Sequence, residues 1–165
     1  MGLRIVPGTA NPLLAGAIAP DLGAAKLAEH YASLLERPVA VVRKTRVSGA
    51  AVRAEQMAGD VAGRPAVIID DMISTGATIE AAARVLLAYG AEPPFAVATT
   101  HGLLVADAAA RLELPAVRSL VTTDSLAQSH PPAPAMQTES VAPLLADAIG
   151  RLHRDQPLGD LLART

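Results

Sequence analysis

The chain has 165 residues, of which 51% are hydrophobic and 2% aromatic, with no cysteine and a formal net charge of -2 at pH 7. This length is most simply one domain with an aliphatic core, and the slightly negative charge argues against a nucleic-acid partner. No apolar run approaches the roughly 18 residues that a membrane span needs, and the lack of cysteine excludes thiolate chemistry and fits a cytoplasmic location.

The first part of the chain predicts short strands around one helix. Residues 17–19 form a brief apolar run, and residues 24–35 carry apolar side chains at helical spacing. Residues 39–42 predict a buried strand. The basic stretch 43–49 that follows has no periodicity, so we expect a mobile loop that extends to about Gly63.

The stretch from Ala66 to Ile79 is the most informative part of the sequence. Its first four residues are apolar without helical spacing, as in a strand buried on both faces. Asp70 and Asp71 stand where we expect that strand to end. Small and hydroxyl residues, 74–78, then lead into a predicted helix.

This order of elements favours a phosphorylated sugar as the ligand. In an open α/β sheet, ligands bind outside the carboxyl ends of the strands, and a helix N-terminus offers N–H groups to a phosphate. The paired carboxylates can accept hydrogen bonds from sugar hydroxyls or hold magnesium. The alternative is an ordinary strand, polar turn and helix, in which two acids at the end of a buried strand are costly without a partner.

The remaining chain alternates strands with helices. This alternation predicts an α/β fold, with a mostly parallel sheet flanked by helices on both faces. The strands are expected at 94–100, 117–122 and 136–139, and the helices at 79–89, 103–112, 140–153 and 157–162, with Ser140 as a cap and Gly90 as a terminator.

Several segments together resemble one family. Residues 69–78 resemble the ribose 5-phosphate or PRPP loop of type I phosphoribosyltransferases. More narrowly, the chain resembles the C-terminal half of ribose-phosphate pyrophosphokinases, also called PRPP synthetases. The similarity covers about 19–162 of a single domain, 1–165, and leaves 1–18 as an atypical N-terminal segment. The segments that carry it are 20–23, 44–46, 59–63, 69–78, 100–102 and 140–149.

The resemblance implies a site for ribose 5-phosphate or PRPP. The family transfers a pyrophosphoryl group from ATP to the anomeric hydroxyl of ribose 5-phosphate, with Mg2+. By resemblance, Asp70 and Asp71 hold the ribose hydroxyls. The residues that cradle the 5-phosphate are Ser74, Thr75, Gly76, Ala77 and Thr78.

The resemblance also implies roles for residues outside the central stretch. Lys44 and Arg46 are the expected catalytic residues, which stabilise the charge of the transferring phosphoryl group. Asp21 is expected to help hold magnesium or the ribose. His101 ends a predicted strand at the same edge of the sheet, and it is either a further site residue or a structural histidine.

Three departures from the family pattern leave alternatives open. The half that carries most of the ATP-binding residues has no counterpart here, Ser74 stands where the synthetases usually have aspartate, and Ala77 replaces a common glycine. A methyl group at position 77 is tolerated if φ is negative. The rivals are a phosphoribosyltransferase that joins PRPP to a nucleobase and a non-catalytic PRPP-binding regulatory subunit. The expected protein partner is a second copy of the chain or a full-length synthetase.

Overall fold

The computed structural model describes residues 17–20, 25–47, 51–105, 107–127 and 136–162. Within these ranges the strands form one seven-stranded sheet in the order β3-β2-β1-β4-β5-β6-β7. Only the β2–β3 pair is antiparallel; every other neighbouring pair is parallel. The strands are β1 (Ala17–Ala19), β2 (Val39–Val47), β3 (Ala51–Ala58), β4 (Val67–Ile73), β5 (Phe95–Gly102), β6 (Val117–Thr123) and β7 (Met136–Glu139).

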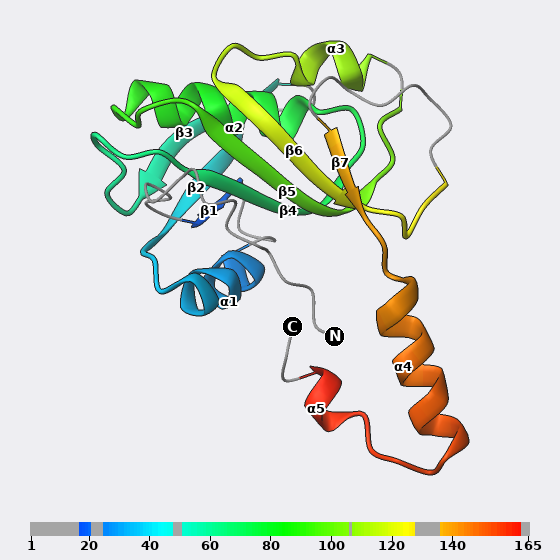
Figure 1. The fold of residues 1–165 in the computed structure, drawn as a ribbon. Helices are drawn as coiled ribbons and strands as arrows, with labels where there is room; N and C mark the ends of the chain where they lie inside the picture. Colours follow the sequence, from blue (N-terminus) through cyan, green and yellow to red (C-terminus); the bar gives the residue numbers. More distant parts are fainter. Residues whose placement is uncertain (1–16, 21–24, 48–50, 106, 128–135, 163–165) are drawn as a thin grey trace.

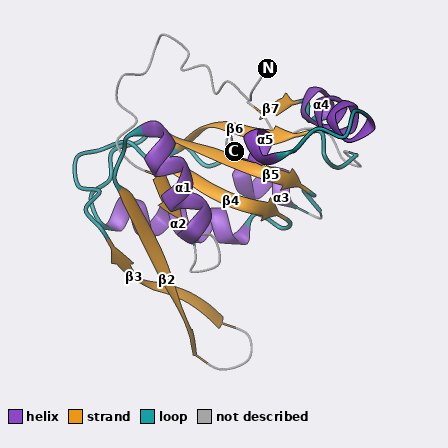
Figure 2. Cartoon of the chain, turned by 90° about the horizontal axis from the view of Figure 1, so that it is seen from below, coloured by secondary structure: helices purple, strands orange, loops and turns teal. Residues whose placement is uncertain are grey.

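Helices cover both faces of this sheet (Figures 1 and 2). Ala28 and Ala32 of the helix on one face pack against Val67 and Ile69, whereas Ile68 belongs to the larger core on the opposite face. Successive side chains of a strand point to opposite faces, so the apolar run of β4 serves both cores. The predicted fold class is confirmed. The helices are α1 (Ala25–Leu35), α2 (Ala77–Ala88), α3 (Ala108–Leu112), α4 (Ala142–His153) and α5 (Gly159–Leu162).

The predicted mobile loop between 43 and Gly63 is wrong. Residues 39–47 and 51–58 form an antiparallel hairpin, with Val47 opposite Ala51 and an irregularity in register after Arg43. The hairpin extends beyond the rest of the sheet (Figure 2). Main-chain hydrogen bonds hold such a pair whatever the polarity of its side chains, so the strands lack the alternation that identifies strands from sequence.

The ends of the central helices follow from local hydrogen bonds. Gly90 has φ +79° and ends α2, as predicted, with the Ala91 amide donating to the Leu86 carbonyl at 2.9 Å. The helix expected at 103–112 is shorter, because α3 begins only at Ala108. The amides of residues 103–105 instead donate to carbonyls at the end of β4.

The last two helices lie apart from the layers. After β7 the chain leaves the sheet as α4 and returns through α5 (Figure 1). No helix among the described residues is long and apolar enough to cross a bilayer.

Candidate functional site

The strand order places a topological switch point at the carboxyl ends of β1 and β4. These strands are parallel neighbours, with Ile18 opposite Ile68, and from them the chain continues in opposite directions across the sheet. Such a switch point is where open α/β sheets bind ligands. At this edge Pro20 follows β1, and the turn Ser74–Gly76 follows β4. Asp21, the predicted magnesium ligand, directly follows Pro20 and lies outside the described residues.

The two aspartates lie inside β4 and not after it, which corrects the prediction. Asp70 is paired with Thr99, and β4 continues to Ile73 because β5 extends to Gly102 and offers it a partner. Consecutive strand residues face opposite sides of the sheet, so the carboxylates are separated. Asp70 is only 7% exposed, whereas Asp71 is exposed. The Asp71 amide donates to Asp70 Oδ1 at 3.0 Å.

The turn after β4 ends in a helix N-terminus with a glycine cap. Gly76 has φ +77°, and its carbonyl accepts the first helical hydrogen bond of α2, from the Glu80 amide at 3.0 Å. As in the first turn of any α-helix, the amides of Ala77 and Ile79 have no acceptor within the helix. Because the cap has no side chain, it supplies no side-chain acceptor to them. Together with the helix dipole, this arrangement suits an anion.

Gly76 and Ala77 differ in what they can accommodate. A Cβ on Gly76 would lie 3.4 Å from both the Ala108 carbonyl oxygen and the Leu112 side chain, in a left-handed conformation that favours glycine. Ala77 is the first residue of α2 and is not among the non-glycine residues with positive φ. The condition under which the alanine is tolerated is therefore met. Thr75 is exposed, and Ser74 and Thr78 are half-buried.

Residues 103–105, which follow β5, hydrogen-bond to the start of the turn between β4 and α2. The Leu103 and Leu104 amides donate to the Ile73 carbonyl at 2.9 and 3.2 Å, and the Val105 amide donates to the Ser74 carbonyl at 3.1 Å. The turn is thus fixed through its carbonyls.

An arginine on α3 adds positive charge beside this turn. Arg111 lies 3.5 Å from Glu80, in the first turn of α2, and Glu80 also pairs with Arg84. A glutamate at this position repels a bound anion, and the two arginines offset that repulsion. Sequence reasoning missed Arg111, because only the packing of α3 on Gly76 brings it here.

His101 is exposed at the same edge and is held by a hydroxyl network. Its Nδ1 lies 2.8 Å from Ser125 Oγ, which donates to the Thr100 carbonyl at 3.0 Å. The single proton of Ser125 is used in that bond, so its oxygen accepts from His101 Nδ1–H. In the neutral ring Nε2 is then an acceptor. The His101 ring is thus held in place through Nδ1, while its Nε2 atom is left for a ligand.

The hairpin carries Lys44 and Arg46 past the same edge. The last residue of β1, Ala19, pairs with Val41, and β2 continues six residues further to Val47. Because β1 and β2 are parallel, this extension lies at the carboxyl-end edge, where the turn after β4 also lies. The side chains of Lys44 and Arg46 lie outside what the structure describes, so their catalytic role stays a prediction.

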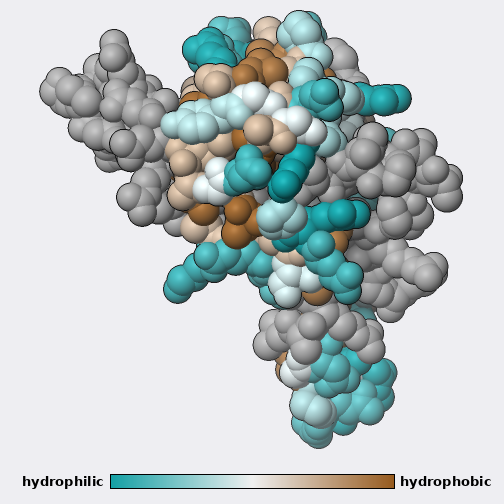
Figure 3. Space-filling model, turned by 90° about the vertical axis from the view of Figure 1, so that its left-hand side faces the viewer, coloured by the Kyte–Doolittle hydropathy of each residue, from teal (hydrophilic) through white to brown (hydrophobic). Residues whose placement is uncertain are grey.

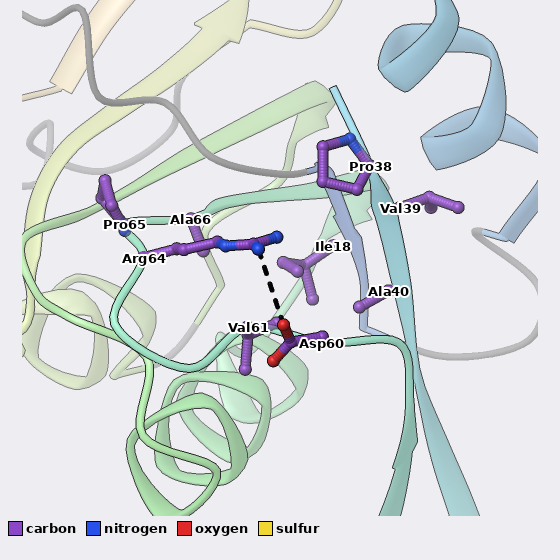
Figure 4. Close-up of a pocket in the computed structure, with 9 residues that line it drawn as sticks. All are labelled: Ile18, Pro38, Val39, Ala40, Asp60, Val61, Arg64, Pro65 and Ala66. Atoms are coloured by element: carbon purple, nitrogen blue, oxygen red, sulfur yellow. Dashed lines mark ion pairs between the residues drawn. The ribbon is translucent and has the colours of Figure 1, made fainter. Parts of the chain in front are cut away.

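The pocket in Figure 4 lies at the opposite end of the sheet. It is lined by residues that precede or begin strands, such as Pro38 and Ala66, and Arg64 reaches across it to Asp60 at 3.6 Å. Its volume of about 10 Å³ is room for roughly one water molecule. It is not the site of a sugar phosphate.

The described residues contain no group of three or more histidine, aspartate or glutamate side chains that could hold a metal ion. Magnesium does not require one, because it usually binds through one or two carboxylates together with substrate phosphates and water. The exposed carboxylate of Asp71 is a donor of that kind.

Comparison with known proteins gives a consistent result. The family model described as phosphoribosyl synthetase-associated domain matches residues 53–163, about two thirds of the chain. The ribose-phosphate pyrophosphokinase of Corynebacterium glutamicum is 40% identical over 141 residues, which are 84% of this chain and 43% of that protein. That of Streptomyces avermitilis is 38% identical over 146 residues, with the same coverage of 84% and 43%. The chain thus spans about half the length of these relatives.

Solved structures agree on the fold. The phosphoribosylpyrophosphate synthetase of Mycobacterium smegmatis matches with a TM-score of 0.76 and 33% identity, over 87% of this chain and 46% of that one. The adenine phosphoribosyltransferase of Thermoanaerobacter pseudethanolicus has a TM-score of 0.52 and 20% identity, over 68% of this chain and 73% of its own. The second likeness concerns the fold alone.

Proposed function

This chain belongs to the phosphoribosyl synthetase-associated domain family, and from that premise we propose that it binds ribose 5-phosphate or PRPP at the turn between β4 and α2. The observation that carries the proposal is the glycine-capped N-terminus of α2, placed directly after the exposed Asp71 at the switch point of the sheet.

The 5-phosphate binds at the start of α2. First-turn amides such as those of Ala77 and Ile79 point out of the helix N-terminus, and the dipole of a twelve-residue helix favours a negative group there. The hydroxyls of Thr75 and Thr78 add donors on the same turn. Arg111 and Arg84 reduce the repulsion from Glu80.

The ribose hydroxyls bind beside Asp71. Its exposed carboxylate accepts hydrogen bonds, whereas the buried Asp70 contacts the Asp71 amide and orients the main chain. The roles that the sequence assigns equally to the two acids are therefore divided in this proposal. Nε2 of His101 offers a further acceptor at the edge.

Magnesium is part of the same proposal. Asp71 and the phosphate oxygens of the ligand would hold it, with Asp21 as a further candidate. When bound, the ion supplies positive charge that neutralises phosphate oxygens.

The proposed reaction is transfer of a pyrophosphoryl group from ATP to the anomeric hydroxyl of ribose 5-phosphate, in the cytoplasm. Lys44 and Arg46 stabilise the spread negative charge, since the hairpin that carries them extends past the ligand edge. A second candidate is a PRPP-binding subunit that uses the same turn without turnover.

Calorimetry with ribose 5-phosphate and with PRPP, each with and without Mg2+, tests the binding site. We expect Asp71→Asn to weaken binding at least about tenfold, because the amide replaces a charge-assisted acceptor by a neutral one. Asp155→Asn, at an exposed aspartate beyond α4, is the matched control. Equal affinities of the two variants and the unchanged protein contradict the proposed site.

A turnover assay separates the two candidates. Protein, ATP, ribose 5-phosphate and Mg2+ are incubated, and AMP and PRPP are measured. AMP formation that depends on ribose 5-phosphate supports the transferase, and Lys44→Ala then lowers the rate with little change in sugar-phosphate affinity. Tight PRPP binding without AMP formation supports the regulatory subunit.

A further inference from the structure

The ends of β5 and β6 approach each other closely at Gly102, the last residue of β5. Gly102 is buried and is not among the glycines with positive φ, so its backbone conformation does not require glycine. Space requires it instead, because a Cβ at this position would lie 2.7 Å from Oγ1 and 3.4 Å from Cβ of Thr122 on β6. Ordinary van der Waals contact begins at about 3.4 Å, so a methyl group would have to push the two strand ends apart by about 0.7 Å.

The side chain of Thr122 cannot yield easily at this contact. It is fully buried, and a β-branched side chain is stiff about χ1. Its hydroxyl has no hydrogen-bond partner among the described residues, so packing and not a hydrogen bond fixes where this side chain lies. The main chain at Gly102 therefore rests on a rigid neighbour.

The residues that follow Gly102 connect this contact to the turn between β4 and α2. Gly102 is paired with Ile73, the last residue of β4. The amides of residues 103–105 donate to the carbonyls of Ile73 and Ser74 at distances between 2.9 and 3.2 Å. Because three consecutive amides are bonded in this way, the segment after Gly102 and the start of the turn move together. The position of Gly102 thus sets the position of the turn ahead of the Gly76 cap.

We propose that Gly102 and Thr122 are positioning residues for the turn between β4 and α2, and that their close contact sets where the first-turn amides of α2 lie. The consequence for a sugar phosphate rests on the proposed function, whereas the position of the turn does not. Binding groups must be held within about 0.5 Å of their productive geometry, and a displacement of about 0.7 Å exceeds that tolerance. Both residues act on the site through the main chain.

Gly102→Ala tests the contact with two measurements. NMR hydrogen exchange follows the amides of Leu103 and Val105, and calorimetry with ribose 5-phosphate and Mg2+ follows binding. We expect both amides to exchange faster than in the unchanged protein, and the affinity to fall about tenfold, because the displaced segment no longer holds the two carbonyls of the turn in place.

Gly59→Ala is the matched control at the other end of the sheet. A Cβ at Gly59 would also lie 2.7 Å from its nearest neighbour, Cβ of Ala40 near the start of β2, and φ of +111° adds strain. That end of the sheet faces the viewer in Figure 3, where hydrophilic side chains are interspersed with apolar ones. This variant should lose at least as much stability as Gly102→Ala and keep its affinity. Equal acceleration of exchange at Leu103 and Val105 in both variants overturns the proposal.

A second substitution tests whether Thr122 is the cause. In the double variant Gly102→Ala with Thr122→Ala, the clashing hydroxyl is gone and the Cβ of residue 122 remains at an ordinary 3.4 Å. We expect slow exchange and affinity to recover to within about threefold of the unchanged protein, although the lost side-chain atoms lower stability further. A loss that came only from reduced stability would instead deepen.

The two measurements separate the two proposals. Failure of the double variant to recover slow exchange overturns the positioning role, as does Gly102→Ala with unchanged exchange or, where the unchanged protein binds, with unchanged affinity. If exchange changes and recovers as expected but ribose 5-phosphate does not bind even the unchanged protein, the positioning of the turn is supported and the proposed function fails.

Discussion

Helices α2 and α4 have the same length but differ in how much of their surface is buried. Each has twelve residues and an apolar stripe, yet α2 buries five residues and α4 buries none. The first packs between the sheet and α3, whereas the second follows the edge strand β7 and leaves the sheet (Figure 1). An apolar stripe therefore indicates that a helix needs a cover, and it does not indicate what supplies the cover.

The difference matters for what each helix can do. The N-terminus of α2 is fixed by the core below it and by α3 beside it, so its amides are held in place. Preorganised donors bind an anion without the cost of ordering them. The exposed apolar stripe of α4, made by Leu144, Leu145, Ile149 and Leu152, has no such support among the described residues.

Truncating one isoleucine in each helix should give the largest contrast. Ile79 of α2 is fully buried, and Ile149 of α4 is 67% exposed. Ile79→Ala should lower the free energy of unfolding by about 2–5 kcal/mol, because it leaves a cavity in a packed core. Ile149→Ala should change it by no more than about 0.5 kcal/mol, because this side chain is already exposed. Urea denaturation measures both changes, and similar losses would contradict the contrast.

A methyl group at Gly76 should have the next largest effect. Gly76→Ala should cost about 1–3 kcal/mol through its left-handed φ and should also weaken sugar-phosphate binding, since it moves the turn. Gly63→Ala is the matched control, because Gly63 has φ +65° and a Cβ at that position would have no neighbouring atom within 4 Å. It should lose similar stability and retain affinity. If both variants lost sugar-phosphate affinity equally, the loss would come from reduced stability of the whole fold and not from the turn at Gly76.

Removing the charge of Glu80 should weaken the fold slightly and strengthen anion binding. The pairs of Glu80 with Arg84 and Arg111 are partly exposed, so Glu80→Gln should cost no more than about 1 kcal/mol. Phosphate affinity should rise because a negative charge leaves the first turn of α2. Glu113→Gln, at the end of α3, serves as control. A fall in phosphate affinity would contradict the position of the anion.

The smallest effect concerns the start of α4. The hydrogen bond from the Ser140 hydroxyl, followed by that from the Val141 amide, holds the pKa of Asp124 below its ordinary value. A lowered pKa stabilises the folded state above the unfolded pKa, and this contribution is lost as pH falls through the folded pKa. Carboxyl NMR should show the low pKa of Asp124 and its return toward the ordinary value in Ser140→Ala. An unchanged pKa of Asp124 in that variant would contradict the Ser140 hydrogen bond as the main cause of the shift.

Local chemistry was enough to predict the strand, turn and helix of the candidate site. The apolar run before Asp70, the small residues of the turn and the helix after them lie close together in the chain, so their pattern is readable without the fold. Gly90 ends α2 for a reason visible in one residue. Arg111 and Ser125, by contrast, reach the site from other elements and carry no local signal.

The sequence alone determined the alternation of strands and helices, the turn between β4 and α2 and the family, because periodicity and turn residues act over a few neighbouring positions. The tertiary structure decided that β4 runs on to Ile73 and that Asp70 and Asp71 face opposite sides. It also decided that residues 39–58 include a hairpin and that α4 leaves the sheet. Each of these depends on which distant segment supplies main-chain partners or apolar cover, and such pairing has no trace in the spacing of nearby residues.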